Sequence, residues 1–331
     1  MKKKELQPAQ APHSWANPLQ SEIERLFYAL FFVPMMKHLD DVKDNAAPSK
    51  SALIRAIDND TLVYRDGAFE GERNSTISRL LKNMGAIFNR TRKAWMIPTE
   101  KLPVDIRNAI GKANQRSAAR ERSVASALHE IHQTVKEIMP KFSFQGYSRE
   151  TLLKMADKVR ATIPAEVALL PKIDLHAQKK LNQDYTDNVR LSIVGFLDDE
   201  VLRFRDKILP QIRKGLSRKE MQQYVDARLG VARERAKFIA REETSLFTSK
   251  LKEVQYKSAG IEKYRWKAIG GSRGDGRTRE SHMRANGLIF YFGRDRNDDG
   301  ISKPVNARGQ ATDPGIDFGC RCQAVPIVES I

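Results

Sequence analysis

The chain has 331 residues, of which 40% are hydrophobic and 30% charged, so it is long enough for two or three domains and too apolar for a disordered protein. Its net charge of +17 favours a polyanionic neighbour, nucleic acid or an acidic protein surface, although charges on solvated helix faces are the alternative. Two cysteines exclude a disulfide framework, and no apolar stretch reaches the length of a membrane span. Because no signal peptide follows the first lysines, we expect a soluble, unsecreted protein.

Residues 1–47 are predicted to form an N-terminal arm and an amphipathic helix. Residues 1–20 show no clear period, which is typical of an arm that is mobile or docked on a partner. Ser21 is expected to cap the helix, whose apolar residues fall at helical spacing: Ile23, Leu26, Phe27, Leu30 and Phe31. Pro34 interrupts the apolar run, and residues 40–50 are predicted to be a linker.

Residues 48–112 are predicted to form a small α/β module. Its expected elements are a helix, a strand ending in an Asp66-Gly67 turn, a helix capped at Asn74 and a hairpin: 51–57, 61–64, 74–85 and 86–97. The hairpin turn carries Arg90, Arg92 and Lys93, which are candidates for binding a nucleic-acid backbone. A charged turn beside the core residue Trp95 is the alternative.

Residues 113–259 are predicted to be a region of long helices. The expected helices are 113–139, one from 148, 184–209 closed by Pro210, and 232–258. Ser217 and Glu220 are spaced as a capping box. His129 and His132 lie three positions apart, which permits a shared ligand, but no third ligand accompanies them. The predicted fold class is therefore α+β, with predominantly long α-helices between a small N-terminal α/β module and a compact C-terminal one.

Residues 260–331 are predicted to form this compact, turn-rich α+β module. It contains both cysteines, Cys320 and Cys322, and also His282. These are ligand types that zinc prefers, and Asp275 or Asp317 is a candidate fourth ligand. A zinc ion here would contribute to folding rather than to catalysis. The alternative is that the cysteines are small buried residues and the histidine bonds to a backbone carbonyl.

A second possible cation site follows in the same module. Asp295, Asn297, Asp299 and Gly300 match the first half of a calcium-binding loop. The twelfth position is Asn306 instead of glutamate, and no flanking helices are indicated. The pattern therefore favours a polar turn between strands.

Several rare elements of this module occur in one order. They are Trp266, Asp-x-Arg-Thr-Arg-x-x-His at 275–282, Asn-Gly at 286–287, and Pro-Gly-x-Asp-Phe-x-Cys-Arg-Cys at 314–322. In this order they resemble the C-terminal module of phage head morphogenesis proteins, the minor head proteins similar to the F protein of phage Mu and its counterpart in phage SPP1. The resemblance covers residues 264–326.

The resemblance implies a minor head protein that acts in procapsid assembly, in the host cytoplasm at first and then in the phage head. It implies the portal protein, major capsid or scaffold protein and packaged DNA as partners, and no membrane. The implied mechanism is binding and positioning, not turnover. The rival hypothesis is a nucleic-acid-processing phosphodiesterase that uses His282, with Arg277 and Arg279 nearby. A stand-alone DNA-binding protein is a third possibility.

Overall fold

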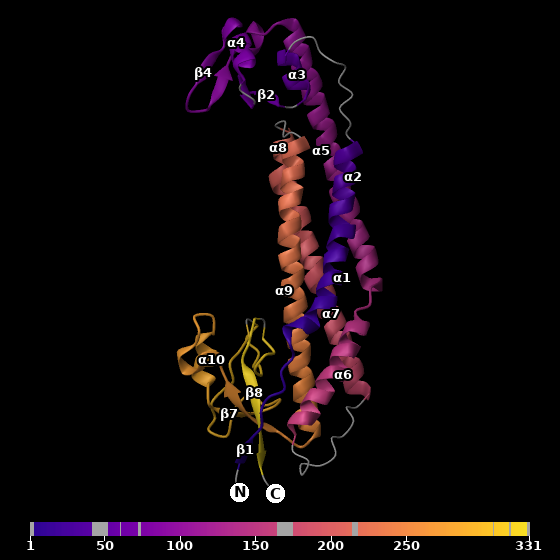
Figure 1. The fold of residues 1–331 in the computed structure, drawn as a ribbon, viewed down its shortest axis with the longest axis vertical. Coiled ribbons are helices and arrows are strands. Elements are labelled where there is room, and N and C mark those ends of the chain that lie inside the picture. The colour runs from indigo at the N-terminus through magenta and orange to yellow at the C-terminus, as the bar shows by residue number, and fades with distance from the viewer. Residues whose placement is uncertain are drawn as a thin grey trace. The chain divides into compact units, whose positions relative to one another are not determined.

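Figure 1 shows the computed structural model, which describes residues 3–41, 52–59, 61–71, 74–163, 175–213, 218–306, 308–317 and 319–329. The fold is α+β and mostly helical, as the sequence predicts. The chain divides into two compact units: unit 1 is Met1–Glu24, Lys141–Ile193 and Glu234–Ile331, and unit 2 is Arg25–Pro140 and Val194–Arg233. The four-part organisation expected from the sequence stays a prediction.

Unit 2 contains the small α/β module. Its elements are α3 (Ala52–Asp58), β2 (Leu62–Arg65), β3 (Ala68–Gly71), α4 (Ser75–Asn83), β4 (Ile87–Asn89), β5 (Ala94–Met96) and η3 (Thr99–Lys101), with antiparallel strands in the order β2-β3-β5-β4. Asp66 and Gly67 both have positive φ, as a type I′ hairpin turn requires. The Asn74 side chain accepts the Ile77 backbone N–H at 2.8 Å, which confirms the predicted helix cap. Strand β3 was not predicted from the sequence.

Two helical segments pass through prolines by way of a π-helical turn. These are α1 (Asn17–Phe27), η2 (Tyr28–Phe32) and α2 (Val33–Asp41), and α7 (Leu175–Arg203), η5 (Phe204–Ile208) and α8 (Leu209–Arg213). Each π-helical turn ends two residues before its proline, Pro34 or Pro210. A wider turn there relieves the crowding between the proline ring and the carbonyl of the preceding turn. The prediction that Pro210 closes its helix is therefore wrong, and Pro34 interrupts the apolar run of the sequence without ending the helix.

Two predicted helix starts also differ from the structure. Ser21 lies inside α1, and its hydroxyl donates to the Asn17 carbonyl at 3.2 Å instead of capping the helix. α9 (Arg218–Ser258) is a single helix where the sequence suggested two, and it ends two residues before Gly260, whose φ of 75° is left-handed. Ser217 of the predicted capping box and residues 42–50 of the predicted linker lie outside the described residues.

The remaining helices are η1 (His13–Ala16), α5 (Val104–Ile138), η4 (Met139–Lys141) and α6 (Gln145–Thr162). In unit 2 the helical core includes Phe27 and Phe196, whose ring centroids are 4.4 Å apart. In unit 1 Tyr185 of α7 packs against Phe247 of α9, with centroids 5.0 Å apart.

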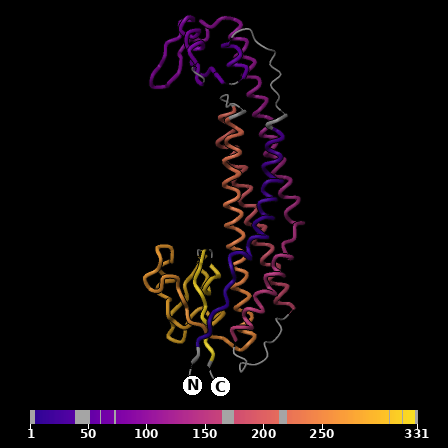
Figure 2. The backbone as a smooth tube through the Cα atoms, viewed as in Figure 1, coloured from indigo at the N-terminus to yellow at the C-terminus, as the bar shows by residue number. Residues whose placement is uncertain are grey.

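The C-terminal part of unit 1 is built on a four-stranded antiparallel sheet. Its elements are β1 (Lys3–Glu5), β6 (Lys263–Lys267), η6 (Gly271–Arg273), α10 (Glu280–Ala285), β7 (Ile289–Tyr291) and β8 (Gln323–Glu329), with strand order β1-β8-β6-β7. β1 pairs with β8, so the two ends of the chain lie side by side (Figure 2). The first residues therefore form an edge strand of the chain's own sheet, and the prediction of an arm that is mobile or docked on a partner is wrong for this part.

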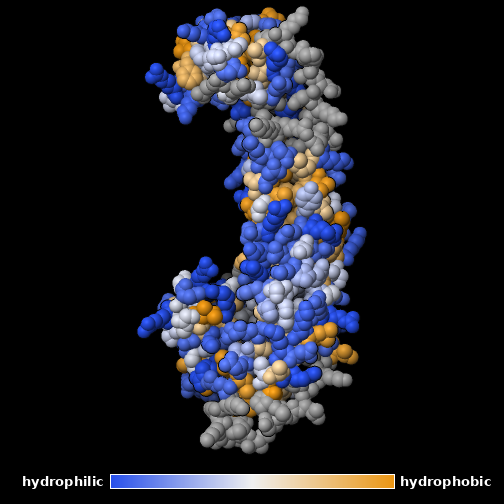
Figure 3. Space-filling view, viewed as in Figure 1, coloured by the Kyte–Doolittle hydropathy of each residue, from blue (hydrophilic) through white to orange (hydrophobic). Residues whose placement is uncertain are grey.

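The face of the molecule shown in Figure 3 is mostly hydrophilic, with smaller hydrophobic patches between the hydrophilic regions. Within the described ranges, no helix combines the length and the apolar character that crossing a membrane would require.

Candidate metal centre

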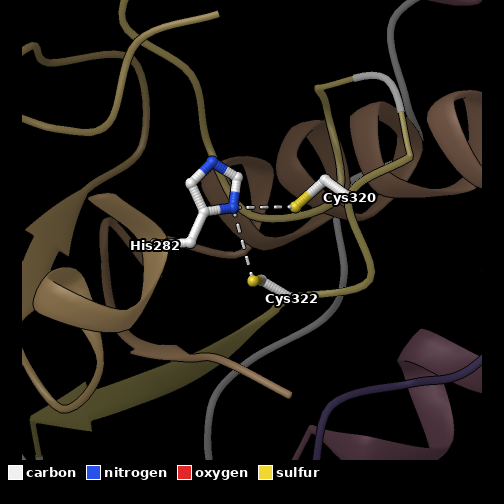
Figure 4. Close-up of side chains that lie close together, drawn as sticks. All are labelled: His282, Cys320 and Cys322. Carbon is white, nitrogen blue, oxygen red and sulfur yellow. Dashed lines mark hydrogen bonds between the residues drawn. The ribbon is translucent and has the colours of Figure 1, made fainter. Parts of the chain in front are cut away.

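The structure brings together three residues that the sequence analysis singled out. The ring nitrogen Nδ1 of His282 lies 3.5 Å from Sγ of Cys320 and 3.6 Å from Sγ of Cys322 (Figure 4). All three side chains are buried, with His282 only 2% exposed. One His nitrogen therefore meets two sulfur atoms inside the protein.

These separations fit a tetrahedral ion. Zinc bonds of about 2.3 Å to sulfur and about 2.05 Å to nitrogen set the N···S separation at roughly 3.6 Å in a tetrahedron. The two N···S distances in this structure, 3.5 and 3.6 Å, match that value. The three donor atoms lie within 4.8 Å of one another, and no fourth His, Cys, Asp or Glu joins them among the described residues.

The orientation of the histidine is set by α10 and β6. The ring of Trp266, which is fully buried in β6, packs edge-on against the imidazole of His282, with centroids 5.2 Å apart and planes at 74°. The other ring nitrogen, Nε2, is buried and has no hydrogen-bond partner among the described residues. Because Nδ1, and not Nε2, faces the two sulfur atoms, Nδ1 is the nitrogen that would bind a metal.

The cysteines lie on a short segment, residues 313–317 and 319–322, which we call the cysteine segment. Hydrogen bonds from backbone N–H groups hold it in place. The N–H of Gly315 donates to Sγ of Cys320 at 3.3 Å, and the N–H of Cys320 donates to the Asp317 carbonyl at 2.9 Å. The N–H of Gly319 donates to the Glu242 carboxylate of α9 at 2.6 Å. These bonds fold the segment back on itself and fasten it to α9.

A buried ionic network holds the start of this segment. Asp313 accepts hydrogen bonds from the Tyr264 hydroxyl at 2.6 Å and from the Lys303 ammonium at 2.5 Å. Burial and the Asp313 carboxylate raise the pKa of the Tyr264 phenol. No local pattern in the sequence shows that residues 264, 303 and 313 meet, so no role was predicted for Lys303 or Asp313.

The two candidate fourth ligands are engaged elsewhere. Asp275 is exposed and accepts from two backbone N–H groups of its own turn and from the Arg321 guanidinium at 2.6 Å, which lowers the pKa of Asp275. Asp317 forms an ion pair with Arg279 at 2.6 Å. The structure therefore does not support an aspartate as fourth ligand. Both ion pairs instead fasten the cysteine segment to the turn before α10.

The two thiols titrate as a pair. The hydrogen bond with Cys320 lowers the pKa of Cys322 to about 7 although burial opposes this. The hydrogen bond with Cys322 and burial raise the pKa of Cys320. Near neutral pH about half of the Cys322 side chains are therefore ionised, and the thiolate is the form that binds metals.

The basic hairpin turn lies between β4 and β5. Arg90, Arg92 and Lys93 are exposed there. The Asn89 side chain accepts the backbone N–H of Arg92 at 2.9 Å, and the Arg92 guanidinium lies 3.5 Å from the carboxylate of Glu70. The structure thus shows three exposed cations in an ordered turn, and nucleic-acid contact at this turn stays a prediction.

Two other groups of potential cation ligands form hydrogen bonds within the chain. The Asn297 side chain accepts two backbone N–H groups of its own turn, at 3.1 and 2.8 Å, as expected of a polar turn. Nδ1 of His132 lies 3.2 Å from a carboxylate oxygen of Asp198, and with His129 they border a groove of about 440 Å³ in unit 2. Neither set gathers three metal-ligating residues within the described part of the chain.

Comparison with known proteins gives a match on the part of the chain that carries the cluster. Residues 203–325 match the family described as "Phage Mu protein F like protein". Over 165 residues the chain is 28% identical to an uncharacterized protein of Haemophilus influenzae, a match that covers 48% of this chain and 33% of that protein. The chain thus spans about a third of the length of this curated relative, and no solved structure matches it. Residues 203–325, which include all three donors of the cluster, are therefore similar to the phage Mu protein F-like family.

Proposed function

We propose that the chain is a minor head protein that acts in procapsid assembly and remains in or near the phage head. In this proposal it binds the portal protein or the major capsid or scaffold protein, and it lies close to packaged DNA. Its mechanism is binding and positioning. The observation that carries the proposal is the family match over residues 203–325.

The surface of the chain is compatible with these partners. The net charge of +17 favours a location beside a polyanion. Apolar side chains that are exposed on the helices offer contact points for other proteins: Tyr28, Val33, Leu191, Leu202 and Val231.

We also propose that His282, Cys320 and Cys322 bind a structural zinc ion. The N···S separations of 3.5 and 3.6 Å and the burial of all three side chains support this. An ion there would link α10 to the cysteine segment, so that one site holds two turn-rich stretches together. Since the surrounding elements are short, the binding energy of the ion would add to the stability of the fold.

The geometry argues against His282 as an acid–base catalyst. Nδ1 faces two sulfur atoms, and Nε2 is buried out of reach of a substrate. A general acid or base must come within hydrogen-bond reach of the proton it transfers. A phosphodiesterase based on this histidine is therefore the weaker hypothesis.

Co-expression with the portal, scaffold and coat proteins of the same phage tests the assembly role. We expect the chain to co-sediment with procapsids, and we expect its omission to reduce the yield of heads that package DNA. Portal-free and coat-free expressions identify the protein that binds it. Normal heads without the chain, together with no co-sedimentation in any combination, would refute the proposal.

A further inference from the structure

We propose that a cavity beside the cysteine segment binds an oxyanion, a carboxylate or phosphate group, through Lys252 and Arg241 of α9. The cavity has a volume of about 370 Å³, which lies in the range of small-molecule sites. Its walls come from the N-terminal residues 10–16, from α9 and from the cysteine segment. The inference goes beyond the assembly role and does not depend on a bound metal.

One face of α9 supplies the polar wall. Arg241, Ser245, Ser249 and Lys252 follow one another at intervals of four, four and three residues, so they lie along one side of the helix. All four line the cavity. The face thus offers two cations with two hydroxyl groups between them, and hydroxyl, ammonium and guanidinium groups are all hydrogen-bond donors to an oxyanion.

Lys252 is the strongest single indication of an anion. Its side chain is part-buried and has neither an ion pair nor a hydrogen bond to any described residue. Burial lowers the pKa of Lys252 to about 8, because no neighbouring carboxylate offsets the loss of water. A buried charge without a partner is costly, and an oxyanion in the cavity would supply that partner.

The other charged groups leave a positive surplus in the cavity. Arg241 is exposed and forms no ion pair with the described residues, and its planar guanidinium suits two-point binding of a carboxylate or phosphate. The lining carboxylate, Glu242, accepts the Gly319 N–H, and the lining Arg321 is paired with Asp275. Neither Lys252 nor Arg241 is neutralised by these groups.

Titration with inorganic phosphate and with acetate, at constant ionic strength set by sodium chloride, tests the site in the full-length protein. Isothermal titration calorimetry should show saturable binding of at least one of the two ions. Binding of phosphate alone would assign the site to phosphate-bearing ligands, and binding of acetate alone to carboxylates. If neither ion binds saturably, the proposal is wrong.

Variants connect the binding to the cavity. Lys252→Met keeps the apolar stem but removes the buried charge, so it should weaken anion binding at least tenfold while leaving the melting temperature equal or higher. Arg241→Gln, at an exposed position, should weaken binding by a smaller factor. Lys250→Met is the matched control, because Lys250 lies on the same helix, is 3.8 Å from Asp184 and does not line the cavity. Wild-type affinity in Lys252→Met would overturn the proposal.

Discussion

His282 and Cys320 are 38 positions apart in the sequence, yet the imidazole Nδ1 lies 3.5 Å from the cysteine sulfur. The histidine sits on α10, a helix of only six residues, which is too short to be stable without tertiary contacts. The contact between His282 and the cysteines is therefore one of the attachments that keep α10 in place. If a zinc ion occupies this point, its removal should loosen both α10 and the cysteine segment.

Elemental analysis of the purified protein should show about one zinc per chain. A ligand that binds only the folded state stabilises it by about 4 kcal/mol when its free concentration is 1,000 times its dissociation constant. A strong chelator should therefore lower the melting temperature of the wild type. Cys320→Ser, Cys322→Ser and His282→Asn should each lower the zinc content, and chelator should then have little further effect on their melting temperatures.

Asp317→Asn is the matched control for these variants, because it breaks the ion pair with Arg279 but removes no donor atom of the cluster. It should keep the wild-type zinc content. A wild type that contains no metal and does not respond to chelator would show that the cysteines are buried packing residues.

Features with a local cause were predicted well from the sequence. The Asp66-Gly67 turn and the Asn74 cap each depend on residue types that suit one local backbone conformation. The three donors of the cluster were also found, because histidine and cysteine are rare in this chain and chemically distinctive.

Features that depend on distant partners were missed. The pairing of β1 with β8 joins the two ends of the chain, and nothing in residues 3–5 indicates a strand. The ion pair between Lys303 and Asp313 is buried, although neither residue differs locally from an exposed one. Lys252 lies on a helix rich in cations, so its burial cannot be read from its neighbours in sequence.

Glu200 and Arg228 form a buried ion pair in unit 2. Nε of Arg228 donates to one carboxylate oxygen of Glu200 at 2.7 Å and Nη2 donates to the other, while the Glu200 side chain is only 2% exposed. Arg228→Met leaves the buried Glu200 carboxylate with only the longer ion pair to Arg203, at 3.6 Å, so it should destabilise the protein by about 3 kcal/mol in urea unfolding. The double variant Glu200→Leu/Arg228→Met should recover most of that loss. If the double variant is no more stable than the single one, the loss comes from packing instead of charge.

Glu243 of α9 should make the stability of the protein depend on pH. Burial raises the pKa of Glu243 to about 7, and the hydrogen bond from the Ser192 hydroxyl, at 3.1 Å, offsets this only in part. Because the pKa is higher in the folded state, the stabilising contribution is fully present below the unfolded pKa of about 4.3 and is lost as the pH rises through about 7. Above that pH the ionised carboxylate costs on the order of 3 kcal/mol.

Glu243→Gln should remove this cost. The variant should be more stable than the wild type by up to about 3 kcal/mol at pH 8 but by only about 1 kcal/mol at pH 5, as measured by urea unfolding at both values. Glu242→Gln, at the adjacent position, keeps an acceptor for the Gly319 N–H and serves as the control. An equal effect of Glu243→Gln at pH 5 and pH 8 would rule out ionisation as the cause.

The basic turn between β4 and β5 should contribute to DNA binding if it contacts phosphates. Each phosphate contact on duplex DNA changes the slope of log affinity against log salt by about 0.9, so three contacts correspond to about 2.7. Arg90, Arg92 and Lys93 are all exposed, and Arg92 is also close to Glu70, so the triple alanine variant should reduce the slope by about 1 to 3. Lys101→Ala/Arg107→Ala/Lys112→Ala changes the net charge by the same amount at exposed positions of the same module. Fluorescence anisotropy with a labelled duplex over a range of salt concentrations gives the slope for each triple variant. Equal slopes for the two variants would mean that the general charge of the chain, and not this turn, attracts DNA.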